Sequence, residues 1–162
     1  IPAITDSSAI RKFSSSLLLY YTGITRTADD ILSEQQTNLS SEPHVATMDK
    51  MVSLVDPFVE AMKKGDIKTC GDLLDINWKL KQNMASKISN KKIGEMYDKA
   101  KKAGAYAGKV AGAGGGGFMM FIVPREKQNL VFEALKEYRE LPFMLDESGS
   151  EVIFNYRSYS SK

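Results

Sequence analysis

The fold of this chain is decided by one stretch, AYAGKVAGAGGGGFMMFIV at residues 105–123. Its first part, Ala105–Ala111, has the composition of a strand. Its last part, Phe118–Val123, is a continuous apolar run typical of a strand that is buried on both faces, and Pro124 ends it. Between them lies a connection made almost wholly of glycine. A strand, a short connection and a second strand predict an antiparallel hairpin.

The connection, here called the glycine loop, consists of Gly112, Ala113, Gly114, Gly115, Gly116 and Gly117. Glycine loses more conformational entropy on folding than any other residue, and two or three glycines would suffice for a flexible hairpin connection. The sequence therefore favours a loop whose backbone approaches a phosphate closely and points several N–H groups at it. A flexible connection without a ligand is the structural alternative.

Three common phosphate-binding motifs fit the glycine loop poorly. The spacing Gly112-x-Gly114-x-x-Gly117 matches the dinucleotide-binding pattern, but a strand follows it where that pattern requires a helix. The Walker motif needs a lysine after the last glycine, where Phe118 stands. A protein-kinase glycine loop does lie between strands, but the chain contains neither His-Arg-Asp nor Asp-Phe-Gly.

Further strands are predicted on both sides of the hairpin. Leu17–Thr22 is short, apolar and aromatic and ends at Gly23, while Phe143–Leu145 and Val152–Tyr156 lie near the end of the chain. We expect residues 17–22, 107–111, 118–123 and 152–156 to form one antiparallel sheet. Its helices are expected on one face, which makes the fold class α+β.

The predicted helices follow from apolar spacing and capping residues. Pro57 interrupts the apolar stripe from Met48 to Met62 and should kink or split that helix. Lys91 and Lys92 are interpreted as solvated lysines at a helix end, and Cys70 as a core residue. The other helices are expected at residues 6–13 and 28–39, from Asp66 through Leu80, from Asn90 to Gly104, and around residues 131–138.

Composition excludes several classes of function. The chain has 162 residues, 22 Lys and Arg against 20 Asp and Glu, and so a net charge of +2, which gives no electrostatic case for nucleic acid or an anionic membrane. No apolar run approaches the roughly 20 residues of a membrane span. The single cysteine fits a reducing compartment, and we expect a cytoplasmic location.

At this point the sequence resembles the GHMP small-molecule kinases, which include galactokinase, homoserine kinase and mevalonate kinase. Residues 109–118, KVAGAGGGGF, are similar to the third signature motif of that family, and residues 71–78, GDLLDINW, to its Gly-x-Leu helix. The segment 102–109, KAGAYAGK, also fits. Within the family, residues 17–26, LLLYYTGITR, most resemble the sugar kinases that act on heptose 7-phosphate.

The resemblance implies that residues 1–162 are one ferredoxin-like C-terminal domain. The family's ATP-binding N-terminal domain, which carries its catalytic Asp and main phosphate loop, has no counterpart in this sequence. The resemblance therefore implies ATP and Mg²⁺ as cofactors, a sugar phosphate as substrate and the N-terminal domain as partner. It places no catalytic residue and no metal ligand in this chain, which alone is expected to be inactive.

For the substrate, the resemblance points to Arg26, with Thr22 and Thr25, as the group that holds the sugar or its phosphate. Arg26 follows a predicted strand end and a glycine, where a guanidinium and free N–H groups can share an anion. A surface ion pair of Arg26 is an equal alternative. A stand-alone ferredoxin-like domain that binds a small anion remains the second class of function.

Overall fold

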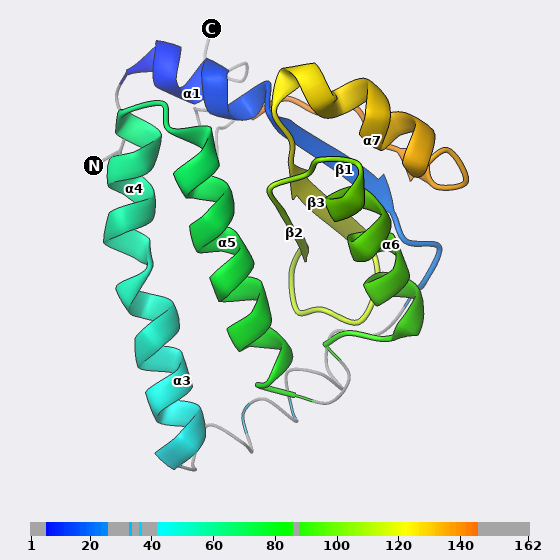
Figure 1. The fold of residues 1–162 in the computed structure, drawn as a ribbon. Helices are drawn as coiled ribbons and strands as arrows, with labels where there is room; N and C mark the ends of the chain where they lie inside the picture. Colours follow the sequence, from blue (N-terminus) through cyan, green and yellow to red (C-terminus); the bar gives the residue numbers. More distant parts are fainter. Residues whose placement is uncertain (1–5, 26–32, 34–35, 37–41, 86–87, 146–162) are drawn as a thin grey trace, which may run out of the picture.

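A computed structural model describes residues 6–25, 33, 36, 42–85 and 88–145 of the chain (Figure 1). Four strands, β1 (Leu17–Tyr21), β2 (Ala107–Val110), β3 (Phe118–Ile122) and β4 (Arg139–Glu140), form one antiparallel sheet in the order β2-β3-β1-β4. Leu17 pairs with Ile122 in β1–β3, and Ala107 pairs with Ile122 in β2–β3. The predicted α+β class and the predicted hairpin are confirmed.

The fourth strand differs from the prediction. Phe143–Leu145, predicted as a strand, has no regular structure, and the strand beside β1 is the pair Arg139–Glu140. Residues 152–156, expected to complete the sheet, lie outside the described residues. Two polar residues cannot show the alternating apolar pattern by which a strand is predicted from sequence. Only the pairing of Arg139–Glu140 with Tyr20 and Tyr21 defines this strand.

Polar caps begin three of the helices at or next to the predicted residues. Asp6 accepts a hydrogen bond from the Ser8 N–H, Asp66 from Thr69 and Asn90 from Ile93, which satisfies amides that the first turn leaves unpaired. The helices are α1 (Ser7–Ser14), α3 (Glu42–Ser53), α4 (Val55–Lys63), α5 (Ile67–Gln82), α6 (Lys91–Lys102) and α7 (Gln128–Ala134), which the 3₁₀ turn Arg125–Lys127 precedes. Of the predicted helix at 28–39, only residues 33 and 36 are described, and both are helical.

The predicted effect of Pro57 is confirmed, with the break three residues earlier. The long apolar stripe is split at Leu54 into α3 and α4, and Pro57 is the third residue of α4. The first turn of a helix has no intrahelical acceptor for its amides, so a proline costs no hydrogen bond there.

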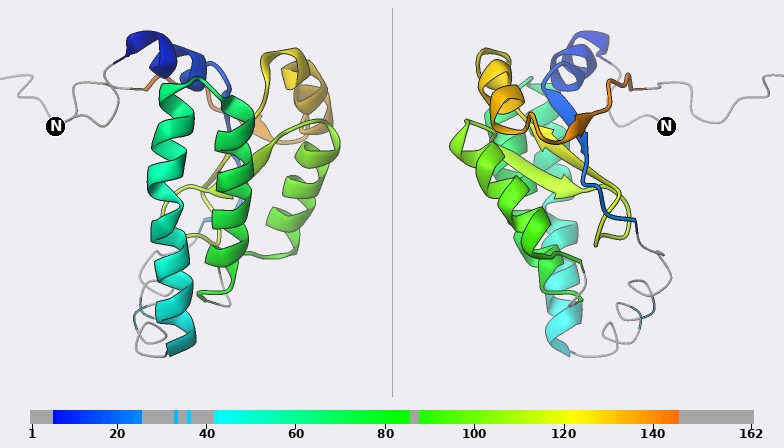
Figure 2. Two further views of the ribbon diagram at one scale, coloured as in Figure 1. Left: turned by 60° about the vertical axis from the view of Figure 1, so that its left-hand side comes forward. Right: turned by 90° about the vertical axis from the view of Figure 1, so that its right-hand side faces the viewer.

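Helices α6 and α7 cover one face of the sheet (Figures 1 and 2). Alternate residues of β1 and β3 point into a core shared with α6 and α7, and α5 runs along β2 with α3 and α4 as an outer layer. No helix in the described ranges is long and apolar enough to cross a membrane. The buried core on this face comprises Leu18, Tyr20, Met119, Phe121, Ile93, Met96, Ala100, Val131 and Leu135, among others.

The opposite face of the sheet is less covered than the sequence predicted. Leu19, Tyr21, Phe118 and Met120 point away from the core of α6 and α7, and each is only half-buried. The prediction that β3 is buried on both faces is confirmed at Ile122, which is fully buried on this face, whereas Phe118 and Met120 are only partly buried there. The described helices α1, α4 and α5 cover this face where Leu17 and Ile122 lie, and they leave its other end less covered.

A second, smaller core lies where β1 begins and β3 ends. Leu17 and Ile122 pack there with Phe13 of α1, Ala61 of α4 and Cys70 of α5. The Cys70 side chain has no exposed surface, which confirms its interpretation as a core residue.

We expect Cys70 to resist thiol reagents in the folded chain. Burial, with a smaller contribution from the negative charge of Asp66, raises the pKa of the Cys70 thiol to about 11. At pH 8 only about one thiol in a thousand is then ionised, and the reactive species is the thiolate. Labelling with a chromogenic disulfide reagent should be slow in buffer and complete in denaturant. Native labelling as fast as that of free cysteine would contradict the buried position.

Candidate functional site

The glycine loop joins β2 to β3 and is closed by a hydrogen bond of 2.8 Å from the Ala111 N–H to the Phe118 carbonyl. Most of its glycines have a backbone that other residues rarely adopt. The φ angles are +76° at Gly112, +117° at Gly114, +75° at Gly115 and +77° at Gly117. Glycine is needed at these positions because a Cβ disfavours positive φ.

Close packing explains two of the loop's glycines. A Cβ on Gly116 would lie 2.6 Å from the Ile24 carbonyl oxygen, and one on Gly114 would lie 3.1 Å from the backbone of Ile88. The loop is therefore pressed between the segment after β1 and the segment before α6. Gly114 and Gly116 are therefore needed for this packing, a structural role that was not predicted from the sequence.

The loop's amides divide into two sets. Gly115 donates to the Ile88 carbonyl and Gly117 to the Ile24 carbonyl, each at 2.7 Å, so these two N–H groups hold the loop in place. Within the described part of the chain, the amides of Gly112, Ala113, Gly114 and Gly116 donate no hydrogen bond to protein. An anion bound by the loop would have to use these four amides.

Thr22 and Thr25 lie at the strand end beside the loop. The Thr22 amide and hydroxyl both donate to the Gly117 carbonyl at 2.9 Å, and Thr22 is only 1% exposed. The Thr22 hydroxyl is thus committed to positioning the loop. The Thr25 hydroxyl is exposed and lies 3.1 Å from the Tyr21 hydroxyl. Arg26 lies outside the described residues.

Lys81 and Lys109 lie beside the start of the glycine loop, and neither was predicted as a site residue from the sequence. Lys81, in the last turn of α5, donates to the Gly112 carbonyl at 2.7 Å. Burial lowers the pKa of Lys81 and of Lys109, and the charge of Lys109 lowers the pKa of Lys81 further. Neither forms an ion pair with a described carboxylate, so this part of the site favours an anion. The sequence carried one signal, the position of Lys109 three residues before the loop.

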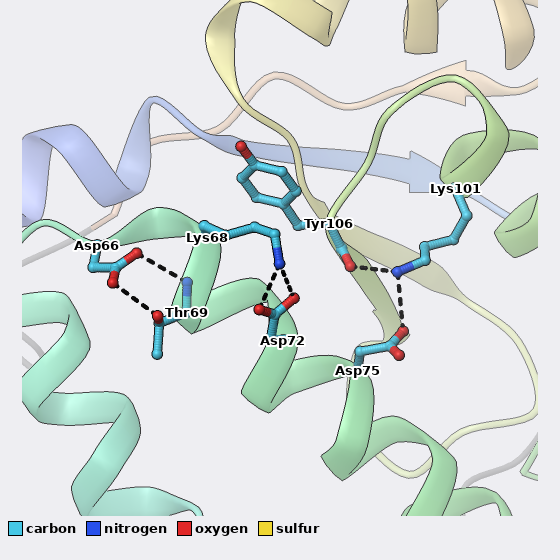
Figure 3. Close-up of polar contacts among 7 residues, drawn as sticks. All are labelled: Asp66, Lys68, Thr69, Asp72, Asp75, Lys101 and Tyr106. Atoms are coloured by element: carbon cyan, nitrogen blue, oxygen red, sulfur yellow. Dashed lines mark hydrogen bonds and ion pairs between the residues drawn. The ribbon is translucent and has the colours of Figure 1, made fainter.

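Polar contacts around α5 fix the strand that leads into the loop (Figure 3). Lys101 of α6 donates to the Tyr106 carbonyl at 2.6 Å and lies 3.4 Å from Asp75 of α5. Burial alone would raise the pKa of Asp75, but hydrogen bonds from Lys79 and Tyr97, with the charge of Lys101, hold it below its usual value. The segments 71–78 and 102–109, separate in sequence, therefore meet here.

No three His, Cys, Asp or Glu side chains come together as metal ligands in the ranges that the structure describes. The described groups around the glycine loop are backbone amides, hydroxyls and lysines. Such groups bind and orient an anionic ligand.

The four-stranded sheet and the glycine loop between β2 and β3 are matched by a domain of the small-molecule kinases. The family model described as "GHMP kinases C terminal" matches residues 58–140, which is half of the chain. The chain belongs to this family, and the resemblance seen in the sequence is confirmed.

Curated relatives carry sugar and mevalonate kinase names. The chain is 36% identical over 121 residues to D-glycero-alpha-D-manno-heptose 7-phosphate kinase of Campylobacter jejuni, which covers 74% of this chain and 36% of that protein. It is 27% identical over 135 residues to mevalonate kinase of Thermococcus sibiricus, covering 79% of this chain and 40% of that protein. The chain thus spans little more than a third of the length of these relatives.

Solved structures agree on the fold. A D-glycero-D-manno-heptose 1-phosphate kinase from Bacteroides thetaiotaomicron is 26% identical with a TM-score of 0.58, over 89% of this chain and 37% of that chain. The mevalonate kinase of L. major is 21% identical with a TM-score of 0.68, over 75% of this chain and 37% of that chain. The second likeness concerns the fold alone.

Proposed function

We propose that this chain is the C-terminal domain of an ATP-dependent sugar kinase that phosphorylates the anomeric hydroxyl of a heptose 7-phosphate. The observation that carries the proposal is the glycine loop, in which four amides beside the Thr22–Thr25 segment donate to none of the described residues. The identity of 36% to a heptose 7-phosphate kinase favours this sugar over mevalonate. The N-terminal domain of the complete enzyme supplies the base and the main nucleotide loop.

In this proposal the residues of this chain bind and orient the phosphate and the sugar. The amides of Gly112, Ala113, Gly114 and Gly116 contact phosphate oxygens, and Lys81 and Lys109 make the foot of the loop positive. Phosphoryl transfer depends on positioning and charge neutralisation more than on covalent chemistry by the protein. ATP, with Mg²⁺, supplies the phosphoryl group when bound. Thr22 fixes the loop beside the substrate, and Thr25 and Arg26 hold the sugar.

The proposal predicts substrate selectivity in the complete protein. With ATP and Mg²⁺, we expect it to convert heptose 7-phosphate to a 1,7-bisphosphate, and to act far less on the unphosphorylated heptose and on mevalonate. Product formation is followed by the appearance of an anomeric phosphate in ³¹P NMR. The 162-residue chain alone serves as the control and should show no turnover.

Each other result has a distinct meaning. Preference for mevalonate would overturn the sugar, and equal activity on both heptoses would overturn the 7-phosphate requirement. Turnover by the chain alone would overturn its dependence on the N-terminal domain.

A further inference from the structure

A polar pocket lies beside Thr22, next to the end of the glycine loop. It has a volume of about 380 Å³, and its walls come from the end of β1, from α6 and from the turn between α7 and β4. Thr22 separates it from the loop, because Thr22 lines the pocket and also donates to the Gly117 carbonyl. The pocket and the glycine loop are therefore neighbours on either side of Thr22.

The charge of this pocket is positive. Lys92 and Arg139 both line it, and neither forms an ion pair with a carboxylate in the described part of the chain. Glu137 also lines the pocket, but Lys99 binds its carboxylate. The pocket therefore presents two cations and one carboxylate that is already neutralised.

Lys92 is held at the wall of the pocket by two contacts. Its ammonium lies so close to Gly23 that a Cβ there would be 2.8 Å from Nζ, and it also lies 5.9 Å from the centre of the Tyr138 ring. Gly23 has a φ of +70°, so the backbone both requires glycine and leaves room for the ammonium. Lys92 is exposed, as predicted for a lysine at a helix end, and it makes these two contacts in addition.

The position of Lys92 in α6 also favours an anion in this pocket. It stands in the first turn, which contains no acidic residue, and the positive end of the helix dipole disfavours a cation there. Lys91, its neighbour, lies 3.9 Å from Glu95, whereas Lys92 has no such carboxylate among the described residues. An anion in the pocket would neutralise Lys92, Arg139 and the helix end together.

We propose that this pocket binds the phosphate group that the sugar substrate already carries, with Lys92 and Arg139 as its ligands. The inference rests on the proposed function for the identity of the sugar, but binding of phosphate by the pocket is independent of it. Charge-assisted contacts of Lys and Arg with phosphate are about twice as strong as neutral hydrogen bonds. The substrate would then lie across Thr22, with its acceptor end at the glycine loop.

The first test measures kinetics in the complete enzyme. We expect Lys92→Gln and Arg139→Gln each to raise the KM for heptose 7-phosphate at least tenfold, while kcat and the KM for ATP stay within about twofold. Lys91→Gln is the matched control, because that side chain is 91% exposed and lies outside the pocket, and it should change nothing. Equal effects of Lys91→Gln and Lys92→Gln, or a rise in the KM for ATP alone, would overturn the inference.

The second test needs no activity. Inorganic phosphate is titrated into the isotope-labelled 162-residue chain at constant ionic strength, and the amide signals of Gly23 and Tyr138 are followed. Saturable shifts are expected that Lys92→Gln abolishes and Lys91→Gln preserves. Shifts that are the same in Lys92→Gln would overturn the inference. The two tests can also disagree. If the shifts depend on Lys92 but the complete enzyme does not phosphorylate heptose 7-phosphate, the proposed sugar is wrong and phosphate binding by the pocket is supported.

Discussion

Gly71→Ala is expected to destabilise the chain, whereas Gly94→Ala, in the next helix, should stabilise it. A Cβ on Gly71 of α5 would lie 2.3 Å from the Tyr106 Cβ. Because the Tyr106 Cβ is fixed to its backbone, no rotamer relieves this clash, and α5 must move away from β2. Overpacking of this kind costs about 3 kcal/mol.

Gly94 of α6 is the matched control for this substitution. It is also helical, but nothing lies within 4 Å of a Cβ built on it. Alanine is more favourable than glycine in a helix by about 1 kcal/mol, so the free energy of unfolding should rise by roughly that amount. Urea unfolding followed by circular dichroism measures both variants. A Gly71→Ala variant as stable as the parent would show that α5 does not pack on Tyr106 as described.

Gly112→Val is expected to lower kcat/KM of the complete kinase about 100-fold, a loss comparable to removing one donor from a preorganised anion site. Gly112 is exposed, and nothing lies within 4 Å of a Cβ built on it, so the valine side chain enters only the space above the loop. It would block the close approach of a phosphate. Gly115 is a poorer choice, because it is buried and its amide holds the loop to Ile88.

The control for Gly112→Val is Gly65→Val, at the end of α4. Gly65 has a φ of +63° against +76° for Gly112, so both substitutions impose a similar backbone strain of about 1–2 kcal/mol. Only Gly112→Val should lower kcat/KM, while both lower the melting temperature. If kcat/KM of Gly112→Val stays within about twofold, worth about 0.4 kcal/mol, the loop is a connector and not a phosphate site.

Local signals in the sequence predicted most of the fold. The apolar strand Leu17–Tyr21 and the caps Asp66 and Asn90 are recognisable because neighbouring residues alone determine them. The two-residue strand Arg139–Glu140 was missed because its identity as a strand depends on a partner more than a hundred residues earlier.

The site was predictable only in part, for a related reason. The glycine loop is visible as composition, but the division of its amides depends on Ile24 and Ile88, which reach it from elsewhere in the chain. Lys81 and Lys92 carry no local signal that separates them from other lysines at helix ends. Their contacts with Gly112 and Gly23 arise only when α5 and α6 are packed.

The strand order β2-β3-β1-β4 has a consequence for biosynthesis. β1 is an inner strand, yet the bond from Thr22 to Gly117 at its end joins residues 95 positions apart in sequence. At about 5–20 residues per second, the ribosome completes β1 about 5–20 s before its partner β3 exists. During that interval the segment LLLYY is an unpaired apolar strand, the kind of segment that pairs with other chains. A nascent chain whose synthesis pauses before Phe118 is therefore exposed to aggregation, and β1 is sheltered only after Phe118–Ile122 has left the ribosome.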